Sequence, residues 1–103
     1  MRTASANPSD PGLLVLVSLA AGPRHGHAIL LDVQDFAGVR LGPGTLYGAI
    51  SRLESEQMIE PMASDGRRRP YRITDHGRST LAGRLRGLEL TVRTGLHRVA
   101  ADS

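Results

Sequence analysis

One segment of the chain, DPGLLVLVSLAAGP at residues 10–23, is apolar on nearly every side of the helix that it predicts. Asp10 is suited to cap the start of this helix, Pro11 to occupy its first position, and Gly22–Pro23 to end it. A helix without a polar face must be buried on more than one side. Other parts of the chain are therefore expected to cover it, and 103 residues suffice for one such domain.

A second helix is expected over about residues 25–37, with Gly38 as its stop. Within it, Ile29, Val33 and Phe36 recur at positions i, i+4 and i+7. Residues with this spacing share one face of a helix. The pattern therefore predicts that all three side chains point into the core.

A third helix is expected over about residues 43–56. Its predicted core face consists of aliphatic residues: Leu46, Ala49, Ile50 and Leu53. The opposite face carries small or polar residues: Gly44, Gly48, Ser51, Arg52 and Ser55. Small side chains allow a helix backbone to approach another surface closely, and that surface need not be protein.

Two short extended runs follow, at residues 58–62 and 70–73. Asp65–Gly66 between them is a strong signal for a hairpin turn. The three arginines Arg67–Arg69 come directly after that turn, so they are expected at the tip of the hairpin. A ribbon of this length is marginally stable alone and must pack against the helices.

A long last helix is expected over about residues 75–100, with Thr74 as its N-cap. Aliphatic residues recur along it with heptad spacing: Leu81, Leu85, Leu88, Val92 and Val99. Such a seam is typical of helices that pair with one another. The pattern predicts that the chain forms a homodimer through this helix.

The order helix, helix, helix, hairpin, long helix predicts a mainly α fold with a small β-hairpin, a winged helix-turn-helix with a long C-terminal dimerisation helix. We expect residues 1–9 to be a flexible arm, residues 10–74 the DNA-binding domain and residues 75–103 the dimerisation helix. The third helix can enter a major groove about 12 Å wide. The arginine-tipped hairpin, or wing, can reach the flanking DNA backbone or minor groove.

The composition excludes several other classes of protein. The chain has no cysteine, so it can form no disulfide, zinc–thiolate site or thiol nucleophile. Aromatic residues make up only 3% of it, which argues against stacking on single-stranded nucleic acid. No nucleophile, base and acid recur at useful spacing, so we expect neither enzyme activity nor a cofactor.

The charge and hydropathy of the chain suit a protein that works beside DNA. The formal net charge is +3, and the chain has arginine but no lysine. The arginine side chain fits phosphate groups and guanine edges. A GC-rich coding bias predicts the same composition. The longest apolar run is too short to span a membrane, and no signal peptide is evident. A cytoplasmic location is therefore expected.

Three strings carry a resemblance to a known family: GPRHGHAILLDV, LGPGTLYGAISRLESEQMIE and GRRRPYRITDHGR. Over about residues 12–100 the chain resembles the PadR family of bacterial transcriptional regulators, in its short form with a single C-terminal helix. The resemblance implies a homodimeric DNA-binding regulator, usually a repressor. It also implies that the third helix reads the operator, that the wing contacts the DNA backbone, and that a small aromatic or drug-like effector binds near the dimer interface.

The candidate DNA contacts come from the second helix, the third helix and the wing: His27, Thr45, Tyr47, Gly48, Ser51, Arg52, Arg67, Arg68 and Arg69. Simpler interpretations stay open for several of them. Tyr47 can pack beside the core, Arg52 can pair with Glu56 one helical turn on, and the wing arginines can be a solvated charged loop.

The chain departs from the family pattern at four positions, which are Gly42, His27, Gln57 and Pro70. Gly42 stands where a serine usually caps the third helix, and Gln57 stands where a glycine usually ends it in a left-handed conformation.

Two alternative functions are a metal-responsive regulator and a winged-helix module that binds protein. The histidines His25, His27, His76 and His97 are weak candidates for metal ligands, because a zinc site needs three or four ligands that converge on one ion.

Overall fold

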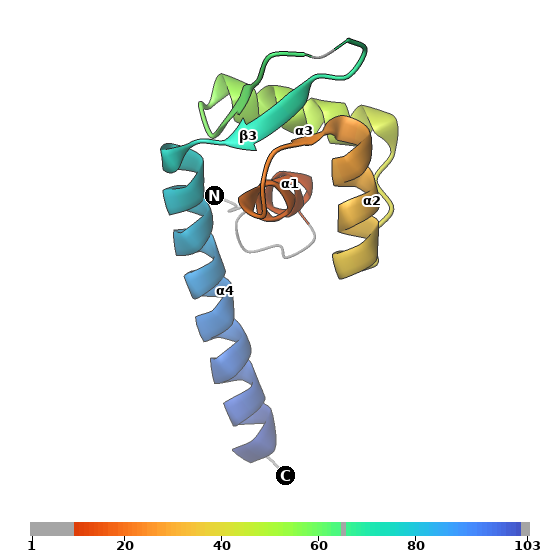
Figure 1. The fold of residues 1–103 in the computed structure, drawn as a ribbon. Coiled ribbons are helices and arrows are strands. Elements are labelled where there is room, and N and C mark those ends of the chain that lie inside the picture. Colours follow the sequence, from red (N-terminus) through yellow and green to blue (C-terminus); the bar gives the residue numbers. More distant parts are fainter. Residues whose placement is uncertain (1–9, 65, 102–103) are drawn as a thin grey trace.

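The computed structural model describes residues 10–64 and 66–101. In chain order its elements are α1 (Pro11–Ala20), β1 (Arg24–His25), α2 (Gly26–Ala37), α3 (Pro43–Ser55), β2 (Ile59–Pro61), β3 (Pro70–Ile73) and α4 (Asp75–Ala101) (Figure 1). The predicted fold class is confirmed: four helices accompany one small antiparallel sheet. The expected arm at residues 1–9, and Asp65 of the expected turn, lie outside the described residues.

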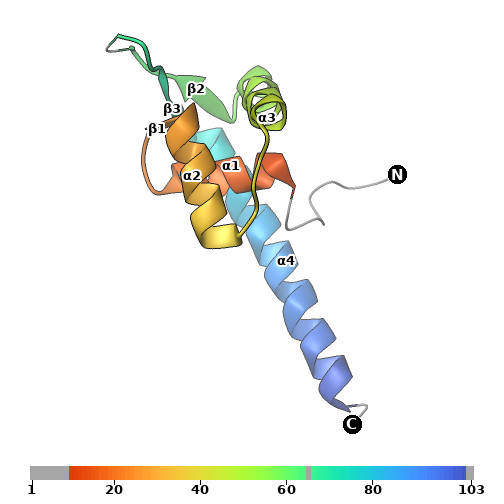
Figure 2. The ribbon, with the colours of Figure 1, turned by 90° about the vertical axis from the view of Figure 1, so that its right-hand side faces the viewer.

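The first helix, α1, lies at the centre of the domain, as its apolar character predicts. Figures 1 and 2 show α2, α3, α4 and the sheet arranged around it. Val15 and Leu16 are completely buried. The carboxylate of Asp10 caps the helix by accepting a hydrogen bond of 3.1 Å from the backbone amide of Leu13.

The sheet contains one strand that the sequence did not predict. Its strands are ordered β1-β3-β2, and both pairings are antiparallel. β1 has only two residues, Arg24 and His25, which pair with Tyr71 and Pro70 of β3. Two residues are too few to produce a strand pattern in a sequence. The consequence is important, because β1 fixes the base of the wing against the start of α2.

The second helix differs from its prediction at one residue. Ile29 and Val33 are fully buried, but Phe36 is 44% exposed, so the prediction that Phe36 belongs to the core was wrong. Phe36 has the correct helical spacing, but it lies in the last turn of α2. That end of the helix extends past α1 (Figure 1), so the core does not reach it. Gly38 ends the helix as predicted, and it does so in the left-handed conformation.

The third helix ends in a conformation that is uncommon for its residue. Gln57 has a φ of 62°, in the left-handed region that favours glycine. The backbone amide of Met58 then turns back and donates to the carbonyl of Leu53 at 2.9 Å. At the other end of α3, Gly42 makes no side-chain cap hydrogen bond. Both features were expected from the sequence.

A compact corner joins the root of α4 to the end of α3. The hydroxyl of Thr74 accepts from the amide of Gly77 at 3.0 Å and donates to the carbonyl of Gln57 at 2.7 Å. Gly77 is buried so tightly that a Cβ placed there would lie 2.0 Å from the carbonyl oxygen of Met58. The predicted N-cap role of Thr74 is confirmed, and its hydroxyl also holds two elements together.

From this corner α4 projects well beyond the domain (Figures 1 and 2). The molecule measures 57 × 26 × 25 Å along its principal axes, and α4 accounts for the long dimension. Only the first turns of α4 pack on the core, through buried Leu81 and half-buried Leu88. Within the described chain no helix is both long enough and apolar enough to cross a bilayer.

Candidate nucleic-acid interface

The wing folds back over the start of α2 and encloses an open hollow of about 330 Å³. Its lining comes from three places in the sequence: His25, Gly26 and His27 at the start of α2, Tyr47 of α3 with Tyr71 of β3, and Arg67, Arg68 and Arg69 of the wing. We call this cavity the wing hollow. The structure therefore places the wing arginines, Tyr47 and His27 around one cavity, although each was predicted separately as a DNA contact.

Among the residues that the structure describes, the lining of the wing hollow carries several hydrogen-bond donors and no carboxylate. Burial, with a further contribution from the charge of Glu54, raises the pKa of Tyr71 above its ordinary value, although Arg69 acts in the opposite direction. Because a raised pKa favours the protonated phenol, the hydroxyl of Tyr71 remains a donor at neutral pH. The hollow is thus suited to an anion.

Tyr47 is 51% exposed, and its ring lies directly over the backbone of Gly26. A Cβ placed on Gly26 would lie 2.4 Å from the Tyr47 hydroxyl oxygen, a distance that the two atoms cannot adopt. Gly26 therefore sets the position of Tyr47, which is a role that sequence reasoning did not assign to it. Tyr47 packs against Gly26 with half of its surface accessible, so packing beside the core and contact with phosphate both stay open as interpretations.

Gly26→Ala is expected to displace Tyr47 from the wing hollow while leaving the domain folded. A rotated tyrosine can relieve the clash at an exposed site, so we expect a loss of at most about 1 kcal/mol in the free energy of unfolding. The affinity for DNA should fall about 10-fold, because the variant gives up one charge-assisted hydrogen bond. Titration of a duplex by fluorescence anisotropy checks this. In a Tyr47→Phe background the same glycine change should have little further effect.

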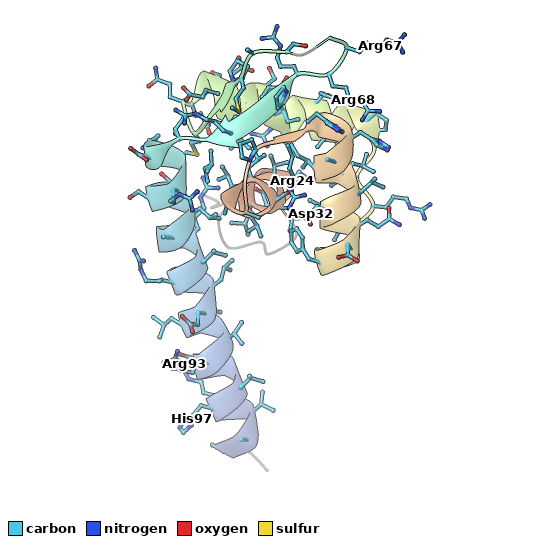
Figure 3. The ribbon with its side chains drawn as sticks, in the orientation of Figure 1. Arg24, Asp32, Arg67, Arg68, Arg93 and His97 are labelled. Carbon is cyan, nitrogen blue, oxygen red and sulfur yellow. The ribbon has the colours of Figure 1, made fainter. Side chains whose placement is uncertain are left out.

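His25 begins α2, and both nitrogens of its ring make contacts. Nδ1 accepts a hydrogen bond from the backbone amide of Ala28 at 3.3 Å and so caps the helix. Nε2 lies 3.1 Å from Nη1 of Arg68, which is 43 residues away in the sequence. Figure 3 shows Arg68 above the start of α2, whereas Arg67 points outward at the tip of the wing.

The arrangement of α3 places its small-residue face in solvent. Leu46, Ala49, Ile50 and Leu53 are buried, which confirms the predicted core face. Thr45, Gly48 and Ser51 are exposed, and a Cβ on Gly48 would have no atom within 4 Å. This open face adjoins the wing hollow, since Tyr47 belongs to the same helix.

Arg52 lies near the start of α1, away from the other residues predicted to contact DNA. Its guanidinium is directed toward the start of α1, where Nη2 would be 3.6 Å from a Cβ on Gly12. It lines a second hollow with Asp10, Glu56 and Arg84, and it does not reach the wing hollow. No ion pair between Arg52 and Glu56 is formed in the described part of the chain. A DNA contact by Arg52 therefore stays a prediction.

The histidines do not come together as a metal site. His25 and His27 lie at the start of α2, whereas His76 and His97 are separated by about 31 Å along α4. Across residues 10–64 and 66–101, no group of three or more histidine, aspartate or glutamate side chains is arranged to hold a metal ion. The metal-responsive alternative gains no support from this part of the chain.

The free part of α4 presents an apolar stripe. Leu85, Val92 and Val99 of the predicted seam are exposed, whereas Leu81 is buried in the core of its own chain. Leu96 is 67% exposed and lies one turn beyond Val92, so it extends the same face although the predicted heptad seam did not include it. We call Leu85, Val92, Leu96 and Val99 the distal stripe.

The sequence of the chain matches that of known regulators. Residues 15–83 match the model of the transcriptional regulator PadR-like family. The chain is 48% identical over 73 residues to an uncharacterised 37.1 kDa protein in transposon TN4556 of Streptomyces fradiae, a match that covers 71% of this chain and 21% of that protein. It is 44% identical over 59 residues to the transcriptional regulator Rv3488 of Mycobacterium tuberculosis, covering 54% of this chain and 55% of that protein. The match thus spans little more than half of one relative and a fifth of the other.

Solved structures share the fold. A PadR family transcription regulator from Clostridium difficile R20291 superposes with a TM-score of 0.77 at 23% identity, over 86% of this chain and 97% of that one. A transcriptional regulator from Clostridium thermocellum superposes with a TM-score of 0.75 at 24% identity, over 91% and 94% of the two chains. At this level of identity the likeness concerns the fold.

Proposed function

The chain belongs to the PadR-like family of transcriptional regulators, and we propose that it is a sequence-specific DNA-binding regulator that acts as a homodimeric repressor in the cytoplasm. The observation that carries the proposal is the wing hollow. Three arginines and two tyrosines line it beside the exposed face of α3, and the described part of its lining has no carboxylate. Duplex DNA offers the matching surface, because its phosphates are regularly spaced anions beside an open major groove.

In the proposed complex α3 enters the major groove. Gly48 allows the backbone to approach the bases, and Ser51 can donate to or accept from a base edge. Thr45, Tyr47 and His27 contact phosphates, and the wing arginines supply affinity that does not depend on sequence. A small-molecule effector that releases the repressor belongs to the same proposal.

Replacement of Arg67, Arg68 and Arg69 by alanine tests the proposed DNA contacts. We expect specific and non-specific duplexes to be bound more weakly by about the same factor. The slope of log affinity against log salt concentration should become shallower by about 0.9 for each phosphate that the variant no longer neutralises. A matched control replaces Arg86, Arg93 and Arg98 of α4, which removes the same charge away from the wing. An equal change of slope in both triple variants would mean that only net charge matters.

The same titration separates the rival function. A winged-helix module that binds protein should bind duplex DNA weakly and without sequence preference. A DNA-binding regulator should show a steep salt dependence and discriminate its operator by about 10³-fold or more. The promoter region upstream of the coding gene is the first duplex to use.

We propose that the distal stripe forms the dimer interface. Val92 and Leu96 are 58% and 67% exposed, and a stripe of this kind is rarely left uncovered in solution. Val92→Asp together with Leu96→Asp is expected to give a monomer, because two buried unpaired carboxylates per chain cost more than the interface supplies. Sedimentation velocity measures the change.

Leu90→Asp is the matched control for this prediction. Leu90 is 64% exposed but lies on the opposite side of α4 from the distal stripe. This variant introduces the same kind of charge and should remain dimeric. If the double variant sediments as a dimer like the wild type, the interface lies elsewhere.

A further inference from the structure

The ring of His25 is approached by two donors, and it cannot accept from both. The amide of Ala28 donates to Nδ1, and Nη1 of Arg68 lies 3.1 Å from Nε2. A neutral imidazole has one nitrogen that accepts and one that carries a proton. The arginine side chain has donors only. One of the two contacts therefore lacks an acceptor.

The protonation states of His25 have different consequences. If Nδ1 accepts from Ala28, then Nε2 carries its proton and points it at a second N–H group. If Nε2 accepts from Arg68, then Nδ1 is protonated and the Ala28 amide loses the cap of α2. A doubly protonated ring loses the cap and also places two cations 3.1 Å apart. In each state at least two N–H groups of this site face each other without an acceptor between them.

Around this pair, the described residues that line the hollow include no carboxylate that could accept from either donor. Both side chains line the wing hollow, where Tyr47, Tyr71 and Arg69 add further donors. The helix cap favours the tautomer with the proton on Nε2, so this N–H and Arg68 both face the same space. An anionic oxygen placed between them would accept from both and would leave the cap intact.

We propose that the wing hollow binds one phosphate group, with His25 Nε2–H and the Arg68 guanidinium donating jointly to one of its oxygens. This inference rests on the proposed function in that the phosphate is taken from the backbone of the bound DNA. It adds His25, which was not among the predicted DNA contacts, and it gives Arg68 a fixed position. Arg68 then differs from Arg67, which extends into solvent at the tip of the wing (Figure 3).

The first arm of the test uses inorganic phosphate and no DNA. The full chain is titrated with phosphate while the ¹⁵N shifts of the histidine and arginine side chains are followed by NMR, and chloride at equal ionic strength serves as the reference. We expect a saturable shift of His25 Nε2 and of the Arg68 guanidinium, with Nδ1 unchanged as an acceptor. His25→Ser keeps a capping oxygen and removes the donor, so it should weaken phosphate binding about 10-fold. His76→Ser, on exposed α4, is the control.

The second arm measures the affinity for a DNA duplex. His25→Ser and Arg68→Ala should each weaken it about 10-fold, since each removes a hydrogen bond to a charged group. The double variant should be weakened by clearly less than the product of the two effects, because both donors serve one phosphate. Arg68→Ala should lower the salt slope by about 0.9, since it removes a permanent charge that neutralises a phosphate.

The outcomes separate the inference from the proposed function. Absence of a phosphate-dependent shift at His25 overturns the inference, whether or not DNA is bound. Full DNA affinity in His25→Ser, with the phosphate response retained in the wild type, overturns the DNA backbone as the source and leaves a site for a free oxyanion. A wild-type chain that binds phosphate but no duplex contradicts the proposed function and supports the oxyanion site.

Discussion

Gly48→Leu is expected to abolish specific DNA binding without unfolding the protein. Gly48 lies in the middle of the exposed face of α3, where a Cβ would meet no atom of the chain within 4 Å. A leucine there fits the free protein, but its side chain occupies the space between the α3 backbone and the DNA bases, so it keeps α3 out of the major groove. The affinity for the operator should fall to the non-specific level, which is a loss of about 10³-fold or more.

The folded state of this variant should be at least as stable as the wild type. Leucine at an exposed helical position favours the helix over glycine by up to about 1 kcal/mol. Thermal melting and operator titration on the same sample measure both effects. Gly83→Leu on α4, where a Cβ also meets nothing within 4 Å, is the matched control and should bind DNA normally. Normal operator binding by Gly48→Leu would show that this face of α3 does not enter the groove.

Gly77→Ala is expected to be the most destabilising small substitution in the domain. Its Cβ would lie 2.0 Å from the carbonyl oxygen of Met58, which already accepts a hydrogen bond of 2.9 Å from the amide of Thr74. Neither backbone segment can move without breaking the corner between α3 and α4. We expect a loss of about 3 kcal/mol, from overpacking together with strained hydrogen bonds.

Urea and thermal unfolding check this expectation. A loss of that size should lower the Tm by roughly 10 °C or more for a domain of this length. The control is Gly83→Ala, at an open helical position, which should raise stability by up to about 1 kcal/mol. A Gly77→Ala variant that melts within a few degrees of the wild type would mean that the corner relaxes easily.

The helices could be predicted because their ends carry residues with local physical roles. Asp10 caps α1, Gly38 ends α2 in the left-handed conformation, and Thr74 caps α4. These roles depend on the backbone within a few residues, so a sequence displays them directly. Periodicity then oriented α3 correctly. It failed for Phe36, because spacing identifies a face of a helix but not where along that face the core ends.

The candidate site was predicted in its parts and not as an assembly. Arginines at a hairpin tip and a small-residue face on α3 are visible in the sequence. The contact between His25 and Arg68 joins residues 43 positions apart, and it depends on the two-residue strand β1. The dependence of Tyr47 on Gly26 is likewise a contact between two helices. Such relations arise from the packing of the whole domain, and no local pattern encodes them.

The corner at Thr74 has a mechanical consequence for a dimer joined through the distal stripe. Thr74 holds the root of α4 to the carbonyl of Gln57, so a movement of α4 is transmitted to the end of α3. α4, from Asp75 to Ala101, is a lever arm about 40 Å long. The proposed crossing point, at Val92 in the middle of the distal stripe, lies about 26 Å from Asp75, so a tilt of about 8° there would move each copy of α3 by about 3–4 Å, close to the axial rise of one base pair. In the proposed dimer, a change at the far end of α4 would thus alter the spacing of the two copies of α3 by about the rise of one base pair.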